Sequence, residues 1–166
     1  MFSICCTSKL LKRTGFPVEV PAPEPTTALG NWYANILFIN RRQILLFVSE
    51  RSRLAVITPA RETRLLADHL KRHLSELLER MNAKPEWIDA EIHQMEDVRY
   101  TKTSSRSVLG TMNDYKIQIE THIERSLYAS EIEIAWNLRE CPVGPLEYES
   151  PEKVTLDLLK KNHETS

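Results

Sequence analysis

Residues 101–114, TKTSSRSVLGTMND, bring together the side chains of this sequence that are best suited to hold an anion. Ser104 or Ser105 is a good N-cap, so a helix is expected to begin here. Its first turns would carry one arginine with hydroxyl, amide and carboxylate groups: Arg106, Ser107, Thr111, Asn113 and Asp114. A helix N-terminus surrounded by such donors suits an anionic ligand.

Gly110 lies in the middle of this polar group. A glycine within a helix costs about 1 kcal/mol relative to alanine, which is understandable where something must approach the backbone closely. Caps and small residues near a helix start are also common as purely structural devices. Both interpretations stay open at the level of sequence.

A second set of candidates lies in residues 31–48, NWYANILFINRRQILLFV, where two apolar runs flank a polar turn. The turn consists of Asn40, Arg41, Arg42 and Gln43. It predicts a hairpin with a basic tip. Exposed arginines at a turn are usually just solvated, but the planar guanidinium can also grip a phosphate or carboxylate. Asn35 interrupts an apolar strand, so we expect it to make a structural hydrogen bond or to point into a polar cleft.

Familiar catalytic patterns are missing from the chain. We find no G-x-S-x-G, Walker loop, H-E-x-x-H, paired-carboxylate or cysteine–histidine signature. His69 and His73 are four residues apart and share a helix face, but no third ligand is evident, so we expect neither a metal nor another cofactor. The three cysteines, Cys5, Cys6 and Cys141, show no C-x-x-C spacing and predict neither a disulfide framework nor a zinc knuckle.

Length and composition suit one soluble domain. The 166 residues are 42% hydrophobic and 27% charged, and we expect a single domain over 1–166 with a proline-rich connector at 17–30 and a frayed tail at 162–166. No apolar run approaches the roughly 20 residues that span a bilayer. The N-terminus lacks the charge order of a secretory signal, so we expect a cytoplasmic protein.

The charge of the chain is unevenly distributed. Residues 1–84 carry 13 Lys and Arg against 7 Asp and Glu, whereas residues 85–166 carry 9 against 16, so the halves sum to +6 and −7. Much of the excess lies in a basic stripe between residues 41 and 72. The stripe could meet a polyanion or the acidic half of a second copy in a homodimer. It could equally be satisfied within the fold, and a pI of about 6.5 disfavours a dedicated nucleic-acid binder.

The elements that position these groups follow from periodicity. Apolar side chains fall on both faces of residues 31–39, which predicts a central strand covered on both sides. Further strands are expected at 2–6, 44–48 and 54–58, with 96–100 returning to an extended form. One or two helical turns are expected at 8–13, and helices are expected at 60–83, 85–95, from Ser104 or Ser105 onward, at 128–139 and at 151–161. The fold class is therefore α+β: a small antiparallel β-meander of three to four strands packed with about four to five α-helices.

Two motifs in this sequence resemble those of an uncharacterised family of small bacterial proteins. One is the W-x-A-N strand leading to an N-R-R turn, and the other is T-x-S-x-R-S-x-L-G-[ST]-M-N-D at the start of a helix. The resemblance covers roughly residues 2–159 and implies kinship rather than a reaction. It points to these positions: Trp32, Asn35, Asn40, Arg41, Arg42, Thr101, Thr103, Arg106, Ser107, Asn113 and Asp114.

Three functions compete on these grounds. The favoured one is a non-catalytic binding module that recognises a protein partner or an anionic ligand through a patch formed by the Asn40–Arg42 turn and the Arg106–Asp114 helix start. The second is a small phosphoester or acyl hydrolase that uses Asp114 as base or metal ligand and Arg106 to stabilise charge. The third is nucleic-acid binding by the basic stripe, where aromatic residues are few.

Overall fold

The computed structural model describes residues 1–126 and 129–165. Its centre is a mixed sheet in the order β4-β3-β2-β1-β5. The strands in these ranges are β1 (Phe2–Cys6), β2 (Trp32–Ile39), β3 (Arg42–Ser49), β4 (Ala55–Pro59) and β5 (Val98–Lys102). The α-helices are α1 (Ser8–Thr14), α2 (Leu66–Arg80), α3 (Pro85–Gln94), α4 (Arg106–Arg125), α5 (Glu131–Leu138) and α6 (Pro151–Thr165). Short 3-10 turns are η1 (Thr63–Leu65) and η2 (Gly144–Leu146).

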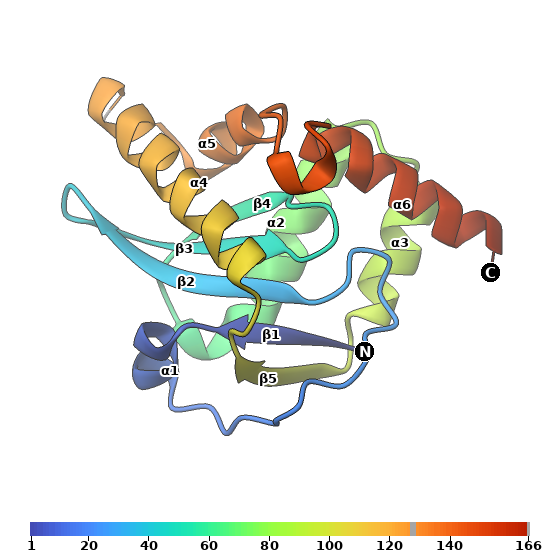
Figure 1. Ribbon diagram of the computed structural model, residues 1–166, viewed down its shortest axis with the longest axis horizontal. Coiled ribbons are helices and arrows are strands. Elements are labelled where there is room, and N and C mark those ends of the chain that lie inside the picture. Colours follow the sequence, from blue (N-terminus) through green and yellow to red (C-terminus); the bar gives the residue numbers. More distant parts are fainter. Residues whose placement is uncertain (127–128, 166) are drawn as a thin grey trace.

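Strand β2 is the middle strand of the sheet, as its two apolar faces predict. In Figure 1, α4 crosses the near face of the sheet and α2 lies behind it. Tyr33 faces α4, and the next residue but one, Asn35, makes the structural hydrogen bonds that were expected of it. Its Oδ1 accepts from Thr7 Oγ1 at 2.7 Å and from the Ile36 N–H at 2.9 Å.

The predicted meander is confirmed for β2, β3 and β4, which pair antiparallel in sequence order. A two-residue turn of Asn40 and Arg41 joins β2 to β3, and both residues have positive φ, 47° and 67°. Such φ values are typical of the hairpin turn whose twist matches the flanking strands. The basic tip therefore exists as predicted.

The sheet as a whole differs from the prediction. β1 pairs parallel with both β2 and β5, so the sheet is mixed and has five strands among the described residues rather than three or four antiparallel ones. Residues 7–31, which contain α1 and the connector, are a crossover long enough to return the chain to the same end of the sheet. Strand direction depends on this path, which local apolar periodicity does not encode.

Most predicted helices are present with shifted ends. The helix expected over 60–83 begins only at Leu66, because Glu62 adopts a left-handed φ of 47° and a 3-10 turn follows it. α6 runs through Thr165, beyond the expected end near residue 161, and no glycine or proline follows Lys161 to stop it. The expected start of a helix at residue 128 and the last residue, 166, lie outside the described ranges.

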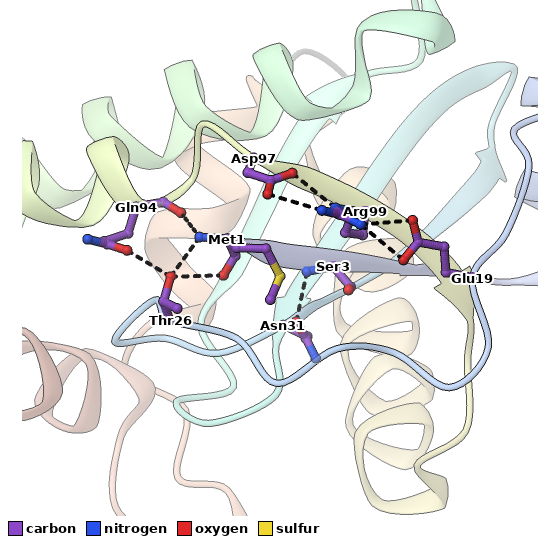
Figure 2. Close-up of polar contacts among 8 residues, drawn as sticks. All are labelled: Met1, Ser3, Glu19, Thr26, Asn31, Gln94, Asp97 and Arg99. Atoms are coloured by element: carbon purple, nitrogen blue, oxygen red, sulfur yellow. Dashed lines mark hydrogen bonds and ion pairs between the residues drawn. The ribbon is translucent and has the colours of Figure 1, made fainter.

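The proline-rich connector is fastened to the β1–β5 side of the sheet (Figure 2). Arg99 of β5 donates from Nη1 to Glu19 Oε1 at 3.1 Å and from Nε to Asp97 Oδ1 at 3.0 Å. The Ser3 N–H of β1 donates to Asn31 Oδ1 at 2.8 Å. The connector is thus an ordered part of the domain at both of its ends.

Glu91 of α3 fastens the last turn of the connector from inside the protein. Only 1% of its surface is exposed, and its carboxylate accepts from the backbone N–H groups of Ala28 at 2.7 Å and Leu29 at 2.9 Å. Burial raises the pKa of the Glu91 carboxyl, against the opposing effect of these two hydrogen bonds. Two buried N–H groups therefore depend on one side chain.

We predict that Glu91→Gln lowers the free energy of unfolding by about 1–3 kcal/mol, because an amide has one acceptor oxygen and leaves one buried N–H group unsatisfied. Urea unfolding followed by circular dichroism measures the change. The exposed Glu96→Gln is the matched control and should be neutral. Equal midpoints for the two variants would contradict the role given to Glu91.

Candidate functional site

A cleft of about 260 Å³ lies between the first three turns of α4 and the segment that joins α5 to η2. Figure 1 shows this segment, between α5 and α6, alongside the start of α4. The cleft is lined by Arg106, Ser107, Gly110, Thr111, Asp114, Tyr115, Gln118 and residues 141–145. Arg106, Ser107 and Asp114 were predicted from sequence, and the fold brings these three to one place.

The start of α4 is fixed by β2. Ser105 is the N-cap, and its Oγ accepts from the Val108 N–H at 3.2 Å. The Ser105 N–H donates to Tyr33 Oη at 2.9 Å, and Tyr33 Oη also lies 3.3 Å from Ser104 Oγ. The buried phenol of the central strand therefore sets where the helix begins and where its first polar side chains lie.

Gly110 leaves the helix backbone open on the floor of the cleft. A Cβ at this position would meet nothing within 4 Å, so packing against neighbours does not require glycine here. Its φ is also ordinary for a helix. Glycine here therefore lowers the stability of the helix by about 1 kcal/mol relative to alanine, and packing does not explain why the position holds glycine.

Arg53 lies directly behind the first turn of α4. Only 7% of its surface is exposed, and its Nη2 donates to Ser107 Oγ at 2.9 Å. Its Nε and Nη1 are buried without a hydrogen-bond partner, and it forms no ion pair with a carboxylate of the described ranges. Burial lowers the pKa of the Arg53 guanidinium, and Tyr115, whose Oη donates to the Arg53 carbonyl at 2.7 Å, acts in the opposite direction.

The far wall of the cleft carries Cys141. Its Sγ donates to Gln118 Oε1 at 3.1 Å. Burial, followed by the charge of Glu140, raises the pKa of the Cys141 thiol, so the thiol stays protonated at neutral pH and is a weak nucleophile. Asp114, on the same side as Gln118, is exposed and has no partner of its own among the described residues.

The other predicted turn does not join this cleft. Arg42 donates to the Ala129 carbonyl and to Glu131 Oε1, both at 2.9 Å, beyond the C-terminal end of α4. Since α4 has 20 residues, its ends are about 30 Å apart. Asn40 and Arg41 are exposed at the hairpin tip. The patch expected to combine this turn with the α4 start is therefore two separate regions.

The remaining predicted positions are mainly structural in their contacts. Trp32 is fully buried in β2, and Thr101 is buried in β5 beside Cys5. The Thr103 N–H donates to the Cys6 carbonyl at 3.3 Å. Asn113 is exposed on α4 but does not line the cleft.

Sequence reasoning missed Tyr33, Arg53 and Cys141. Tyr33 was read only as an apolar strand residue, although its hydroxyl would have needed a partner in a buried strand. Arg53 belongs to the basic stripe between residues 41 and 72, and nothing in the local sequence distinguishes it from Arg51. Cys141 is separated from α4 by an entire helix, so only the tertiary fold reveals their proximity.

The described residues show no group of three or more His, Cys, Asp or Glu side chains that could hold a metal ion. His73 Nδ1 lies 2.9 Å from the His69 carbonyl, so the two rings do not converge on one point through that nitrogen. None of the described helices is long and apolar enough to cross a bilayer.

Comparison with known proteins places the chain in a family. No curated protein matches the chain. The family model described as "Domain of unknown function (DUF6933)" matches residues 3–154 of the 166, which agrees with the resemblance drawn from the two sequence motifs. The chain belongs to the DUF6933 family.

Proposed function

We propose that this protein is a non-catalytic intracellular binding module and that its ligand is recognised in the cleft at the start of α4. The observation that carries the proposal is the convergence of Arg106, Ser107 and Asp114 around a bare helix backbone at Gly110. Charged and hydroxyl groups beside a concave surface suit specific recognition of a polar ligand or of a polar group on a protein partner. No covalent chemistry is needed for this role.

The basic stripe gives weaker support to nucleic-acid binding. Arg42 pairs with Glu131, Arg51 donates to the Thr27 carbonyl at 3.0 Å, and Arg53 is buried. These charges point to different parts of the molecule. A track for a polyanion needs aligned, solvent-facing cations, so we place this function behind the cleft.

A hydrolase is the second candidate, because Arg106, Asp114 and the Cys141 thiol line one cleft. Arg106 and Asp114 are eight residues apart on α4, which is about 12 Å along the helix axis. Groups that act on one reacting atom must come within about 3–3.5 Å of it. Together with the raised pKa of Cys141, this separation favours binding over catalysis.

We predict that Gly110→Ala raises the free energy of unfolding by about 1 kcal/mol, because alanine restricts the unfolded chain and its Cβ meets no neighbour. Urea denaturation measures the effect. Gly15→Ala is the contrasting control. Gly15 ends α1 with a φ of 67°, so alanine at this position should lower the free energy of unfolding. A loss of stability in Gly110→Ala would mean that the backbone at this position needs glycine for the fold.

We predict that Gly110→Leu keeps the fold and abolishes ligand capture, because the added side chain fills the cleft floor without a clash at Cβ. Capture from host lysate on the immobilised protein, with bound species identified by mass spectrometry, measures this. Lys116→Leu adds the same side chain to an exposed site on the same helix, outside the cleft, and should capture as wild type does. Equal capture by wild type and Gly110→Leu would remove the cleft from the proposal.

The hydrolase candidate predicts turnover of p-nitrophenyl phosphate or p-nitrophenyl acetate that Asp114→Asn abolishes. For a binding module we expect both substrates to be hydrolysed at the rate of buffer alone, by wild type and by Asp114→Asn. Release of p-nitrophenol is followed by absorbance. Turnover by wild type that is lost in Asp114→Asn would replace the binding proposal with the enzymatic one.

A further inference from the structure

We infer that the cleft takes a small phosphate monoester, with the phosphate held at the first turn of α4 by Arg106 and Ser107 and with Arg53 directly behind it. The inference rests on the proposed function, since it names the ligand class of the same cleft. It starts from a buried arginine, Arg53, that forms no ion pair with a carboxylate of the described residues.

Arg53 is the first step. The residue is more than nine-tenths buried, two of its guanidinium nitrogens have no hydrogen-bond partner, and the third donates to Ser107 Oγ on the wall of the cleft. Its backbone is held in the left-handed region, φ 60°, where a bulky residue is disfavoured. The nearby carboxylate of Glu50 accepts the Asn31 N–H at 2.8 Å and forms no ion pair with Arg53. An unpaired buried charge of this kind is stabilised by an anion nearby.

Ser107 connects the buried Arg53 to the cleft through a hydrogen bond. Because Ser107 Oγ accepts from Arg53, its own O–H remains free to donate to a ligand oxygen. The donor to Oγ is charged, which strengthens the O–H as a donor in turn. Thr111 does not compete for this proton, since its hydroxyl donates to the Ser107 carbonyl at 3.3 Å.

The helix start adds further donors. Arg106 and Ser107 occupy the first two positions of α4, so their backbone N–H groups have no carbonyl partner within the helix. The first turn of α4 carries no acidic residue, and its positive end is left uncompensated by side chains. The exposed Arg106 guanidinium can close over the same position.

Charge and size together favour a phosphate monoester over a carboxylate. Two guanidinium groups match the charge of about −1.5 to −2 on such a phosphate at pH 7, whereas a carboxylate would neutralise only one. Asp114 lies about 12 Å along the helix from Arg106. Its carboxylate would repel a second anionic group and would accept a hydrogen bond from a hydroxyl or amine group of the ligand. A volume of about 260 Å³ is below the range of drug-sized sites, so the ligand is small.

The test is isothermal titration calorimetry with glycerol 3-phosphate, inorganic phosphate and acetate. We expect wild type to bind the two phosphates and to show no measurable binding of acetate. Arg53→Met, which removes the guanidinium but keeps an unbranched stem and the backbone strain, should weaken glycerol 3-phosphate binding about tenfold or more. The charge-matched control Arg61→Met, an exposed site outside the cleft, should leave the affinity unchanged.

The apo protein provides a second readout. Arg53→Met should melt no lower than wild type, because it removes an unpaired buried charge. A lower melting temperature with unchanged phosphate affinity would give Arg53 a purely structural role and overturn the inference. Unchanged affinity in both Arg53→Met and Gly110→Leu would locate phosphate binding elsewhere and overturn it as well.

Two outcomes separate this inference from the proposed function. If wild type binds neither phosphate while Gly110→Leu still abolishes capture from lysate, the cleft is retained as the binding site and the phosphate monoester is rejected as its ligand. If Arg53→Met does not fold, the wild-type protein labelled with ¹⁵N-arginine replaces it. Adding inorganic phosphate should then shift the Nε–H resonance of Arg53 and leave that of Arg61 in place, and an unmoved Arg53 resonance would overturn the inference.

Discussion

A strand that is apolar on both faces must be covered on both faces, and this requirement of β2 organises the rest of the molecule. Helix α4 covers one face and α2 covers the other, while β1 and β3 form hydrogen bonds with the two edges of β2. Because side chains alternate along β2, Tyr33 must point toward α4, and its hydroxyl needs a partner there. The partner is the N-terminal cap of α4. The packing of β2 therefore determines where α4 begins and where the residues of the candidate site lie.

Arg53 is the feature that stability alone does not explain. Desolvating an ion costs several kcal/mol even after relaxation, and one hydrogen bond to a hydroxyl returns only about 1.5–3 kcal/mol. A net stability of about 5–15 kcal/mol leaves little room for such a deficit. The hairpin turn that contains Arg53 adds a left-handed backbone, where glycine or asparagine is usual. Both costs fall on one residue, which donates a hydrogen bond to Ser107 of the cleft wall, and the phosphate inference rests on this observation.

Sequence reasoning succeeded where one physical pattern decides the outcome. The helix expected from Ser104 or Ser105 onward is α4, and its buried face consists of Val108, Met112, Tyr115, Ile119 and Ile123 at helical spacing. The alternation in β2 and the polar turn after it predicted the central hairpin. Strand direction was not accessible, because β1 and β5 join the sheet through crossovers that local patterns do not specify. Of the residues at the candidate site, Arg106, Ser107 and Asp114 share one helix and are therefore accessible to sequence reasoning, whereas Arg53 and Cys141 approach it through tertiary packing alone.

The hairpin turn and the start of α4 are separated by about the length of α4, and only the start of α4 lines the cleft. The second wall of the cleft is the segment that follows α5. Arg42 fixes the start of α5 through the Ala129 carbonyl and Glu131, in an ion pair whose side chains are each only 24% exposed. The capping box of Ser130 and Glu133 completes that helix start. Arg42 and the cleft-lining residues 141–145 therefore lie beyond opposite ends of α5, so this arginine contributes to the placement of the helix and not to the lining of the cleft.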